Sequence, residues 1–363
     1  MNILIFAARE FNPIMGGIER VSSQLAIFLK EKGHNVYFLC GLKTNGPEYT
    51  PSTKQFFLPN GFKGNKENRE YILNLIDKYN INVIINQTDF GSLFSRSYIP
   101  KKIKIVSVIH NSYKAMLMAK PNLYKKLRYR LAMSYFLSKV ALMSDKIIVF
   151  SEKFISEYKY FCKLPIRNKF AIIPNFNTYP EVENYDKKEK IVLYVGRLFN
   201  ENKRVDRLLN IWKKIECKNK EWYLNIIGDG EDREMLYDLS KSLNLKRVNF
   251  LGATNPEENY KKASIFCMTS SYESFGMVLT EAMQFGVVPI LFNSYATASE
   301  IVNNNNDGFL INPFDLNEYS LKLIELINNE QLREKMSNNA KLSVKKFSID
   351  NIGSLWIKLL NSI

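Results

Sequence analysis

The sequence predicts an α/β protein built from two Rossmann-like, doubly wound domains that face each other across a cleft. Short β-rich segments alternate with helical patterns along the whole chain, which is typical of this class. Several of these segments are apolar on both faces, as are strands of a parallel sheet covered by helices. The chain has 363 residues, 46% of them hydrophobic, which is enough for two cores.

The first half of the chain begins as a β-α-β unit, with a strand over 2–8, a helix over 18–32 and a strand over 35–40. The further strands expected there cover 83–85, 103–109 and 146–150. The second half repeats the rhythm, with strands over 191–195, 223–227, 248–251 and 265–268 and helices over 205–215 and 233–243. Two domains of similar construction follow from this repetition.

The boundary between the halves is expected in segment 174–190, which has the proline, asparagine and charge content of an exposed linker. We therefore predict an N-terminal domain over 1–175 and a C-terminal domain over 176–348. The last segment, 349–363, is apolar at helical spacing and is expected to pack back on the first domain.

The net charge of +15 is divided unevenly between the halves. Residues 1–180 hold 27 lysines and arginines against 11 acids, whereas residues 181–363 hold 24 against 25. The asymmetry indicates an anionic partner that meets the first half: nucleic acid, anionic lipid or a phosphorylated substrate.

Composition excludes several classes. The aromatic content of 13% rules out a disordered or collagen-like chain. The four cysteines are far apart and only two histidines accompany them, so neither a disulfide framework nor a metal site is expected. The first strand is too short for a signal peptide and no run of 18 apolar residues occurs, which predicts a cytoplasmic protein without a membrane span.

Glycines and cations at expected strand ends indicate a site for a diphosphate. Gly16 and Gly17 lie between the first strand and the first helix, where a tight turn without a ligand is the alternative explanation. In the second half, Arg197 follows a strand-terminal glycine and Lys203 precedes a helix, so that both reach the carboxyl end of the sheet. Gly228 ends the next strand in a loop that either meets a ligand or simply turns.

The most specific motif has two carboxylates eight residues apart, Glu273 in a loop and Glu281 in the helix expected from about residue 275. Glu281 is expected one and a half to two turns into that helix. The carboxylates suit hydroxyl groups of sugar and ribose, and the amides at the helix start suit a phosphate. A capping Glu273 and a solvated Glu281 are the alternative explanation. The residues expected to line this donor site are Ser274, Phe275, Gly276, Met277 and Val278.

His110 follows an apolar strand and is expected at the carboxyl end of the first sheet, in the cleft, unless it is a core histidine with a backbone partner. His34 lies in a helix-to-strand turn at the opposite edge, and we interpret it as structural.

Together these motifs resemble the retaining glycosyltransferases of family four, which have the GT-B fold, over nearly the whole chain. The resemblance implies that Arg197 and Lys203 bind the donor diphosphate and Glu281 the ribose, that Gly16 and Gly17 close over the phosphates, and that His110 and Glu273 are the catalytic residues near the transferred sugar. One departure is that no third glycine follows Gly17. No metal or other cofactor is expected, in agreement with the lack of an Asp-x-Asp motif.

Segment 113–144 contains seven cations and no acid, interleaved with aromatic and aliphatic residues. This pattern is typical of a helix at an anionic lipid surface, and a solvated helix face is the alternative. The residues predicted to contact the membrane or acceptor are Lys120, Lys125, Lys126, Arg128 and Arg130.

We therefore predict a retaining hexosyltransferase that carries a hexose or N-acetylhexosamine from a nucleotide-diphosphate sugar to a lipid-linked glycan at the inner face of the cell membrane. UDP is the expected nucleotide and GDP the alternative. A nucleotide-sugar epimerase is the competing enzyme class. A non-catalytic relative and a nucleic-acid-binding protein are weaker alternatives, because the site residues are intact and no nucleic-acid reading motif occurs.

Overall fold

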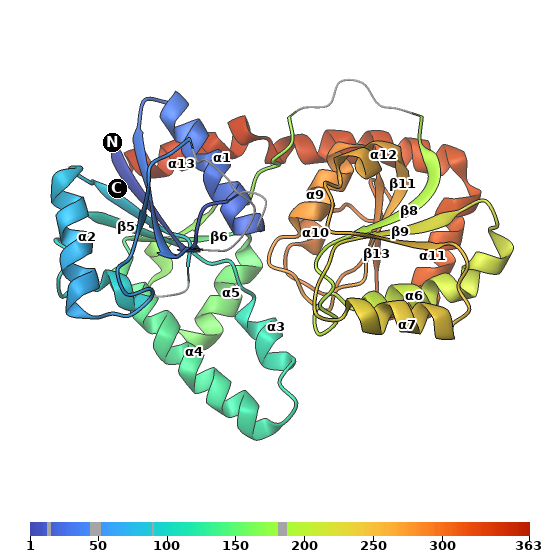
Figure 1. Cartoon of the computed structure of the whole chain (residues 1–363), viewed down its shortest axis with the longest axis horizontal. Helices are drawn as coiled ribbons and strands as arrows, with labels where there is room; N and C mark the ends of the chain where they lie inside the picture. The colour runs from blue at the N-terminus through green and yellow to red at the C-terminus, as the bar shows by residue number, and fades with distance from the viewer. Residues whose placement is uncertain (13–15, 44–51, 89–90, 181–186) are drawn as a thin grey trace. The chain divides into compact units, whose positions relative to one another are not determined.

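The computed structural model describes residues 1–12, 16–43, 52–88, 91–180 and 187–363. The chain forms two units, which we describe separately. Unit 1 consists of Met1–Thr178 together with Ile349–Ile363, and unit 2 of Tyr179–Ser348. Figure 1 shows a sheet with helices on both faces in each unit.

The sheet of unit 1 is parallel, with the strand order β3-β2-β1-β4-β5-β6-β7 among the described residues. The strands are β1 (Asn2–Arg9), β2 (Asn35–Leu42), β3 (Gln55–Phe57), β4 (Val83–Asn86), β5 (Lys104–Val108), β6 (Lys146–Val149) and β7 (Phe170–Ile172). The predicted strands are confirmed. The strands β3 and β7 were not predicted, because three residues are too few to show a period.

The helices of unit 1 are α1 (Gly17–Glu31), α2 (Lys66–Lys78), α3 (Tyr113–Met118), α4 (Leu123–Met143), α5 (Glu152–Phe161) and α13 (Ile349–Asn361). The last of these packs against α1. The contact is close: a Cβ atom on Gly353 would lie 2.4 Å from the ring of Phe28. The final helix of the chain thus completes the unit that the first strand begins.

The sheet of unit 2 is also parallel, with the described strands in the order β10-β9-β8-β11-β12-β13. They are β8 (Glu189–Val195), β9 (Tyr223–Ile227), β10 (Val248–Gly252), β11 (Ala263–Met268), β12 (Val288–Phe292) and β13 (Phe309–Ile311). The helices are α6 (Val205–Ile215), α7 (Arg233–Ser242), α8 (Glu257–Lys262), α9 (Met277–Gln284), α10 (Ala298–Ile301), α11 (Leu316–Asn328) and α12 (Glu330–Ser343). Two doubly wound sheets confirm the predicted fold class.

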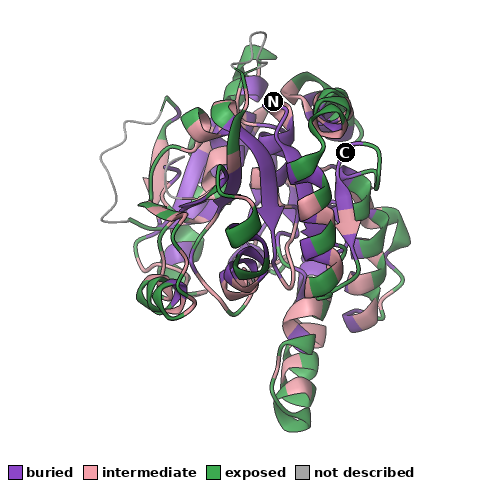
Figure 2. Cartoon of the chain, turned by 90° about the vertical axis from the view of Figure 1, so that its right-hand side faces the viewer, coloured by how far each residue is buried: buried purple, intermediate pink, exposed green. Residues whose placement is uncertain are grey.

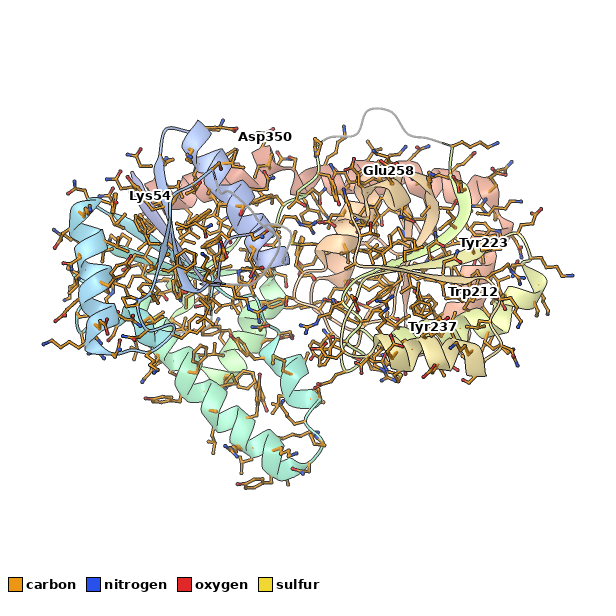
Figure 3. All side chains as sticks on the ribbon, in the orientation of Figure 1. Lys54, Trp212, Tyr223, Tyr237, Glu258 and Asp350 are labelled. Atoms are coloured by element: carbon orange, nitrogen blue, oxygen red, sulfur yellow. The ribbon has the colours of Figure 1, made fainter. Side chains whose placement is uncertain are left out.

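The core of unit 2 illustrates why the helical pattern could be read from the sequence. Leu208, Trp212 and Ile215 of α6 recur at intervals of four and three residues, and all are buried. Trp212 is labelled in Figure 3 together with Tyr223, which begins β9 and is exposed. Burying one such aliphatic side chain contributes about 1.5–3 kcal/mol.

The predicted exposed linker is wrong in its first part. Asn175, Phe176 and Asn177 are buried, Phe176 to 1% exposure. The side chain of Gln284 donates hydrogen bonds to the carbonyl groups of Tyr179 and Pro180, at 3.0 and 2.8 Å. The composition of the segment predicted exposure to solvent. The buried ring of Phe176 and the side-chain amide of Gln284 instead hold this stretch in place. Residues 181–186 of the predicted linker lie outside the described residues.

Each sheet has one position where the strand order reverses direction: between β1 and β4 in unit 1, and between β8 and β11 in unit 2. Open parallel sheets bind ligands beyond the carboxyl ends of the strands at such a position, because the loops on either side diverge there. The loops after β8 and β11 and those after β1 and β4 are therefore where we look for the site.

Candidate functional site

The loops after β8 and β11 bring Lys203 and Glu273 together. The Lys203 ammonium lies 2.6 Å from Oε1 of Glu273, although the residues are 70 positions apart. The Ser270 hydroxyl donates to the same carboxylate oxygen at 2.7 Å. The side chains of the pair are only 20% and 11% exposed. A mostly buried ion pair thus lies where the strand order of unit 2 reverses.

Further hydrogen bonds join the same two loops. The Ser271 amide donates to the Asn202 carbonyl at 2.6 Å, and the Thr269 hydroxyl donates to the Arg204 carbonyl at 2.9 Å. The guanidinium of Arg207, in the first turn of α6, reaches the Ser271 hydroxyl at 3.2 Å and the Thr269 carbonyl at 3.4 Å. Together these bonds fix the backbone that carries Lys203 and Glu273.

Arg207 is a site residue that the sequence analysis missed. The one available signal was its position four residues after Lys203, on the first turn of the following helix. Partial burial lowers the pKa of its guanidinium to about 10, which leaves it cationic at neutral pH. The guanidinium also lies 4.1 Å from the centre of the Phe314 ring.

Arg197 has a different partner from Lys203. Its guanidinium lies 2.5 Å from Oε1 of Glu231, and both side chains are more than half exposed. Ion pairs this exposed contribute little to stability. The pair can therefore open at little cost, which leaves the guanidinium available to an anionic ligand.

Gly228 is required by the packing of two strand ends. Its φ is +142°, and a Cβ atom there would lie 1.9 Å from the Gly196 carbonyl oxygen. No other residue fits so close to a neighbouring backbone. The glycine was predicted as a donor-site residue, and the structure gives it a steric role at the same edge of the sheet.

The helix after Glu273 begins at Met277, two residues later than predicted. Gly276 has a left-handed φ of +85° and forms the N-cap of α9. Phe275 precedes the helix with its side chain buried against Phe347, at 5.4 Å between ring centres, so that side chain belongs to the core. Ser274, Gly276, Met277 and Val278 are partly exposed along the start of the helix.

Glu281 is 1% exposed, and the Tyr260 hydroxyl lies 3.3 Å from its Oε2. Because α9 begins at Met277, Glu281 lies about one turn into the helix, and the predicted position of one and a half to two turns is wrong. The alternative of a solvated Glu281 is excluded. Tyr260 also packs against Phe285 and Tyr179, which joins this carboxylate to the start of unit 2.

In unit 1, Gly16 is the N-cap of α1 and Gly17 its first residue; Met15, which precedes them in the motif, lies outside the described residues. The φ of Gly16 is −179°, an extended conformation that any residue adopts. Glu19 lies in the same first turn, and burial raises the pKa of its carboxyl group.

His110 follows β5 and is buried, at 8% exposure. Its Nε2 lies 2.7 Å from Oε1 of Gln87, which directly follows β4 and was not predicted. Gln87 could have been predicted from its position: it follows β4, which pairs in parallel with the β5 strand before His110, so both residues lie at the same edge of the sheet. Burial lowers the pKa of His110 to about 4. His34 lies elsewhere, with its Nδ1 3.2 Å from the N-terminal amine.

The predicted basic segment forms α3 and α4, which project beyond the sheet of unit 1 in Figures 1 and 2. The first buried side chain along α4 is that of Leu137, fifteen residues into a helix of 21. Apolar side chains in the first part of α4 are more than half exposed: Leu123, Tyr124, Leu127, Leu131 and Tyr135. The cations Lys125, Lys126, Arg128 and Arg130 lie among them, and Lys120 precedes the helix.

In the part of the chain that the structure describes, no group of three or more histidine, cysteine, aspartate or glutamate side chains is arranged to hold a metal ion. Nor do the described helices include one that is both long and apolar enough to cross a membrane.

Two family models match consecutive parts of the chain. "Glycosyltransferase Family 4" matches residues 15–176, and "Glycosyl transferases group 1" matches residues 175–343. The matches meet close to the boundary between unit 1 and unit 2.

Individual proteins are similar over long stretches. An uncharacterized glycosyltransferase of Haemophilus influenzae is 29% identical over 95% of this chain and 96% of its own length. An α-1,4-N-acetyl-D-galactosaminyltransferase of Campylobacter jejuni, named for a glycan on diphosphoundecaprenol, is 31% identical over 67% of this chain and 65% of its own. The structure of Anabaena Alr3699/HepE with UDP-glucose covers all of both chains at 17% identity and a TM-score of 0.78.

Proposed function

This chain belongs to family four of the glycosyltransferases, with the GT-B fold, and we propose that it transfers a hexose or N-acetylhexosamine from a UDP-sugar to a lipid-linked glycan. Transfer with retention of the anomeric configuration is part of this proposal. The observation that carries it is the Lys203–Glu273 pair, mostly buried at the reversal point of unit 2.

The chemistry of transfer explains why cations belong there. Cleavage of a nucleotide-sugar places negative charge on the departing diphosphate, and preorganised positive groups stabilise that charge. Lys203 and Arg197 supply two cations from one loop, and the amides at the start of α9 supply a partial positive charge. These groups suffice for leaving-group stabilisation without a metal ion, and we propose metal-independent transfer.

The carboxylates have complementary roles. Glu273 is held by the Ser270 hydroxyl and the Lys203 ammonium, and we assign it to the transferred sugar, whose hydroxyl groups donate hydrogen bonds. We assign Glu281 to the ribose; because it is buried against Tyr260, this role requires the tyrosine to yield to the nucleotide. In unit 1 we assign Gly16 and Gly17 to the phosphates and His110 to the sugar. In a front-face mechanism the departing phosphate accepts the proton of the acceptor hydroxyl.

Donor binding is tested by thermal shift with UDP, GDP, ADP and UDP-sugars, with EDTA present. A ligand at 100 times its dissociation constant adds about 2.7 kcal/mol to the free energy of unfolding. We expect a selective rise with uridine ligands that Arg197→Ala and Lys203→Ala weaken. The matched control is Lys190→Ala, since Lys190 forms an exposed pair with Glu221 at the opposite end of β8. No shift with any nucleotide would refute the proposal, and a shift that requires divalent cation would refute metal independence.

The acceptor part of the proposal rests on α4. At about 100° per residue, one face of the helix spanning about 120° carries a stripe of exposed apolar side chains. The stripe consists of Leu123, Tyr124, Leu127, Leu131 and Tyr135. Lys125 and Arg128 flank it on one side, and Lys126 and Arg130 on the other. An apolar stripe between two rows of cations matches a surface of anionic headgroups over acyl chains.

We therefore propose that α4 places unit 1 on the inner face of the cell membrane, where a carrier lipid presents its glycan. The name of the Campylobacter jejuni relative supports this acceptor class. A solvated helix does not need five exposed apolar side chains on one face. The proposed location is thus peripheral rather than membrane-spanning.

Vesicle sedimentation at about 0.15 M salt tests this location. We expect the protein to bind vesicles of phosphatidylglycerol and phosphatidylcholine but not of phosphatidylcholine alone. Leu131→Glu should weaken binding about tenfold or more, because it removes an exposed leucine proposed to insert between the lipids and adds a charge that the anionic headgroups repel. Leu321→Glu is the matched control, since Leu321 is equally exposed on α11 of unit 2. Equal binding by the two variants would exclude the α4 stripe.

A further inference from the structure

We propose that Gln87 is a positioning residue: it holds the proton of the His110 imidazole on Nε2, so that Nδ1 is offered as a hydrogen-bond acceptor to a substrate hydroxyl group. The substrate part of this inference rests on the proposed function. The tautomer itself is a property of the ligand-free protein.

The geometry begins with two adjacent strands. In the parallel register of β4 and β5, Asn86 lies opposite Ser107, so residues 87 and 110 leave the sheet at the same edge. The backbone amide of Gln87 donates to the Phe6 carbonyl at 2.9 Å. The side-chain oxygen of Asn86 accepts from the backbone amide and the hydroxyl of Thr88, at 3.1 and 2.9 Å. The backbone on both sides of Gln87 is therefore fixed.

The contact between the two side chains determines the tautomer. Oε1 of Gln87 can only accept a hydrogen bond, so Nε2 of His110, 2.7 Å away, must carry the proton. Both residues are buried, at 3% and 8% exposure, and water competes little for the bond. The Phe150 ring, 5.4 Å from the imidazole, packs beside it.

A neutral imidazole carries one proton, so Nδ1 keeps its lone pair. Burial also disfavours the cation, and neither Gln87 nor Phe150 offers a charge to restore it. Such a nitrogen can accept from a sugar hydroxyl but cannot donate to a phosphate oxygen. His110 is therefore suited to orienting a sugar rather than to neutralising the leaving group.

The tautomer can be measured directly, because the chain contains only two histidines, His34 and His110. We would label the full-length protein with ¹⁵N-histidine, assign the signals with His34→Gln, and record long-range ¹H–¹⁵N spectra at neutral pH. His110 should show a protonated Nε2 and an unprotonated Nδ1. A proton on Nδ1 would overturn the proposal.

Two substitutions at Gln87 show whether its side chain positions the His110 proton or only packs against the imidazole. Gln87→Leu removes the acceptor and should shift the ratio of tautomers about tenfold toward Nδ1–H. Gln87→Glu keeps an acceptor oxygen and should preserve the proton on Nε2. Thermal unfolding shows whether each variant folds. A ratio unchanged in folded Gln87→Leu would refute a role for Gln87.

Turnover tests the use of Nδ1, with the UDP-sugar that gives the largest thermal shift as probe. His110→Asn places an amide oxygen near the former Nδ1, whereas His110→Gln places its amide near Nε2. We expect the Asn variant to retain about five to ten times the turnover of the Gln variant. Equal or reversed turnover would overturn the acceptor role. Failure of every UDP-sugar to bind would refute the proposed function but leave the tautomer measurement valid.

Discussion

The two sheets carry different chemistry at the same kind of edge. In unit 2 the loops at the reversal point present ions: Lys203 paired with Glu273, and Arg197 paired with Glu231. In unit 1 the corresponding edge presents a neutral, buried pair, His110 and Gln87. Ions suit a departing diphosphate, whereas neutral hydrogen-bonding groups suit the orientation of a sugar. The same fold has thus been given two electrostatic characters.

The contrast runs opposite to the overall charge. The half of the chain that holds 27 basic residues against 11 acids is the one with the neutral His110–Gln87 pair. Much of its excess lies on α3 and α4, which project beyond the sheet. The net charge therefore reflects exposed cations on these helices, and the chemistry of the site has to be read from individual side chains.

The largest effect is expected from removing the buried cation of unit 2. Under the proposed function, Lys203→Ala should lower turnover about 10²- to 10³-fold, because the departing diphosphate loses a preorganised positive group and Glu273 loses its partner. Steady-state release of UDP measures the loss. Lys190→Ala, at an exposed pair on the other edge, should retain normal turnover. A loss of turnover below threefold in Lys203→Ala would contradict the role of charge at this edge.

Gly228→Ala should disrupt the carboxyl edge of the unit 2 sheet by a steric clash. The new Cβ atom would collide with the Gly196 carbonyl at a φ of +142°, at a cost of about 3 kcal/mol in the free energy of unfolding. Hydrogen exchange should show faster opening of β8 and β9, with β4 and β5 of unit 1 unaffected. Equal protection of β8 and β9 in variant and parent would show that the strand ends tolerate the methyl group.

The buried, neutral His110 of unit 1 should make the stability of the protein sensitive to acid. The pKa of His110 is lowered from 6.5 to about 4, so between these values the unfolded chain binds more protons than the native one. The free energy of unfolding should therefore fall with falling pH across this window, by up to about 3 kcal/mol. Urea titrations from pH 7 to 4 should show a shallower fall in His110→Asn. Groups common to both proteins, such as His34, cancel in this comparison, and parallel pH profiles would contradict it.

The smallest effect is expected at Arg207, which touches the loops rather than the reacting groups. Arg207→Lys keeps the charge but loses the Nη1 group, which donates to both the Thr269 carbonyl and the Ser271 hydroxyl, so turnover should fall about tenfold or less while donor affinity changes little. Comparing the change in kcat with the change in KM distinguishes a loss of turnover from a loss of donor affinity. An equal loss of affinity would indicate that Arg207 contacts the nucleotide itself.

Four of the described strands and the charged residues of unit 2 could be predicted from sequence because their signals are local, whereas β12 and β13 were not predicted. Continuous apolar runs gave the parallel strands, and the glycine before Arg197 marked a strand end. Since the carboxyl ends of parallel strands share one edge, Lys203 and Glu273 could be expected near each other despite the intervening 70 residues.

What could not be predicted depends on backbone conformation and on tertiary contacts. The start of α9 moved to Met277 because Gly276 adopts a left-handed conformation, which spacing does not reveal. Phe275 belongs to the core because Phe347, far along the chain, packs against it. Gln87 and Arg207 contact residues on other strands and loops. A single sequence does not show how those strands and loops align with one another.

The packing of α13 on α1 has a consequence for synthesis. Unit 2 is one continuous stretch, Tyr179–Ser348, whereas unit 1 needs residues from both sides of it. A ribosome delivers the chain from its N-terminus, so unit 2 can fold while unit 1 still waits for Ile349–Ile363. Until Gly353 reaches the ring of Phe28, an apolar face of α1 stays uncovered. The earliest part of the chain to be made is thus the last to be completed.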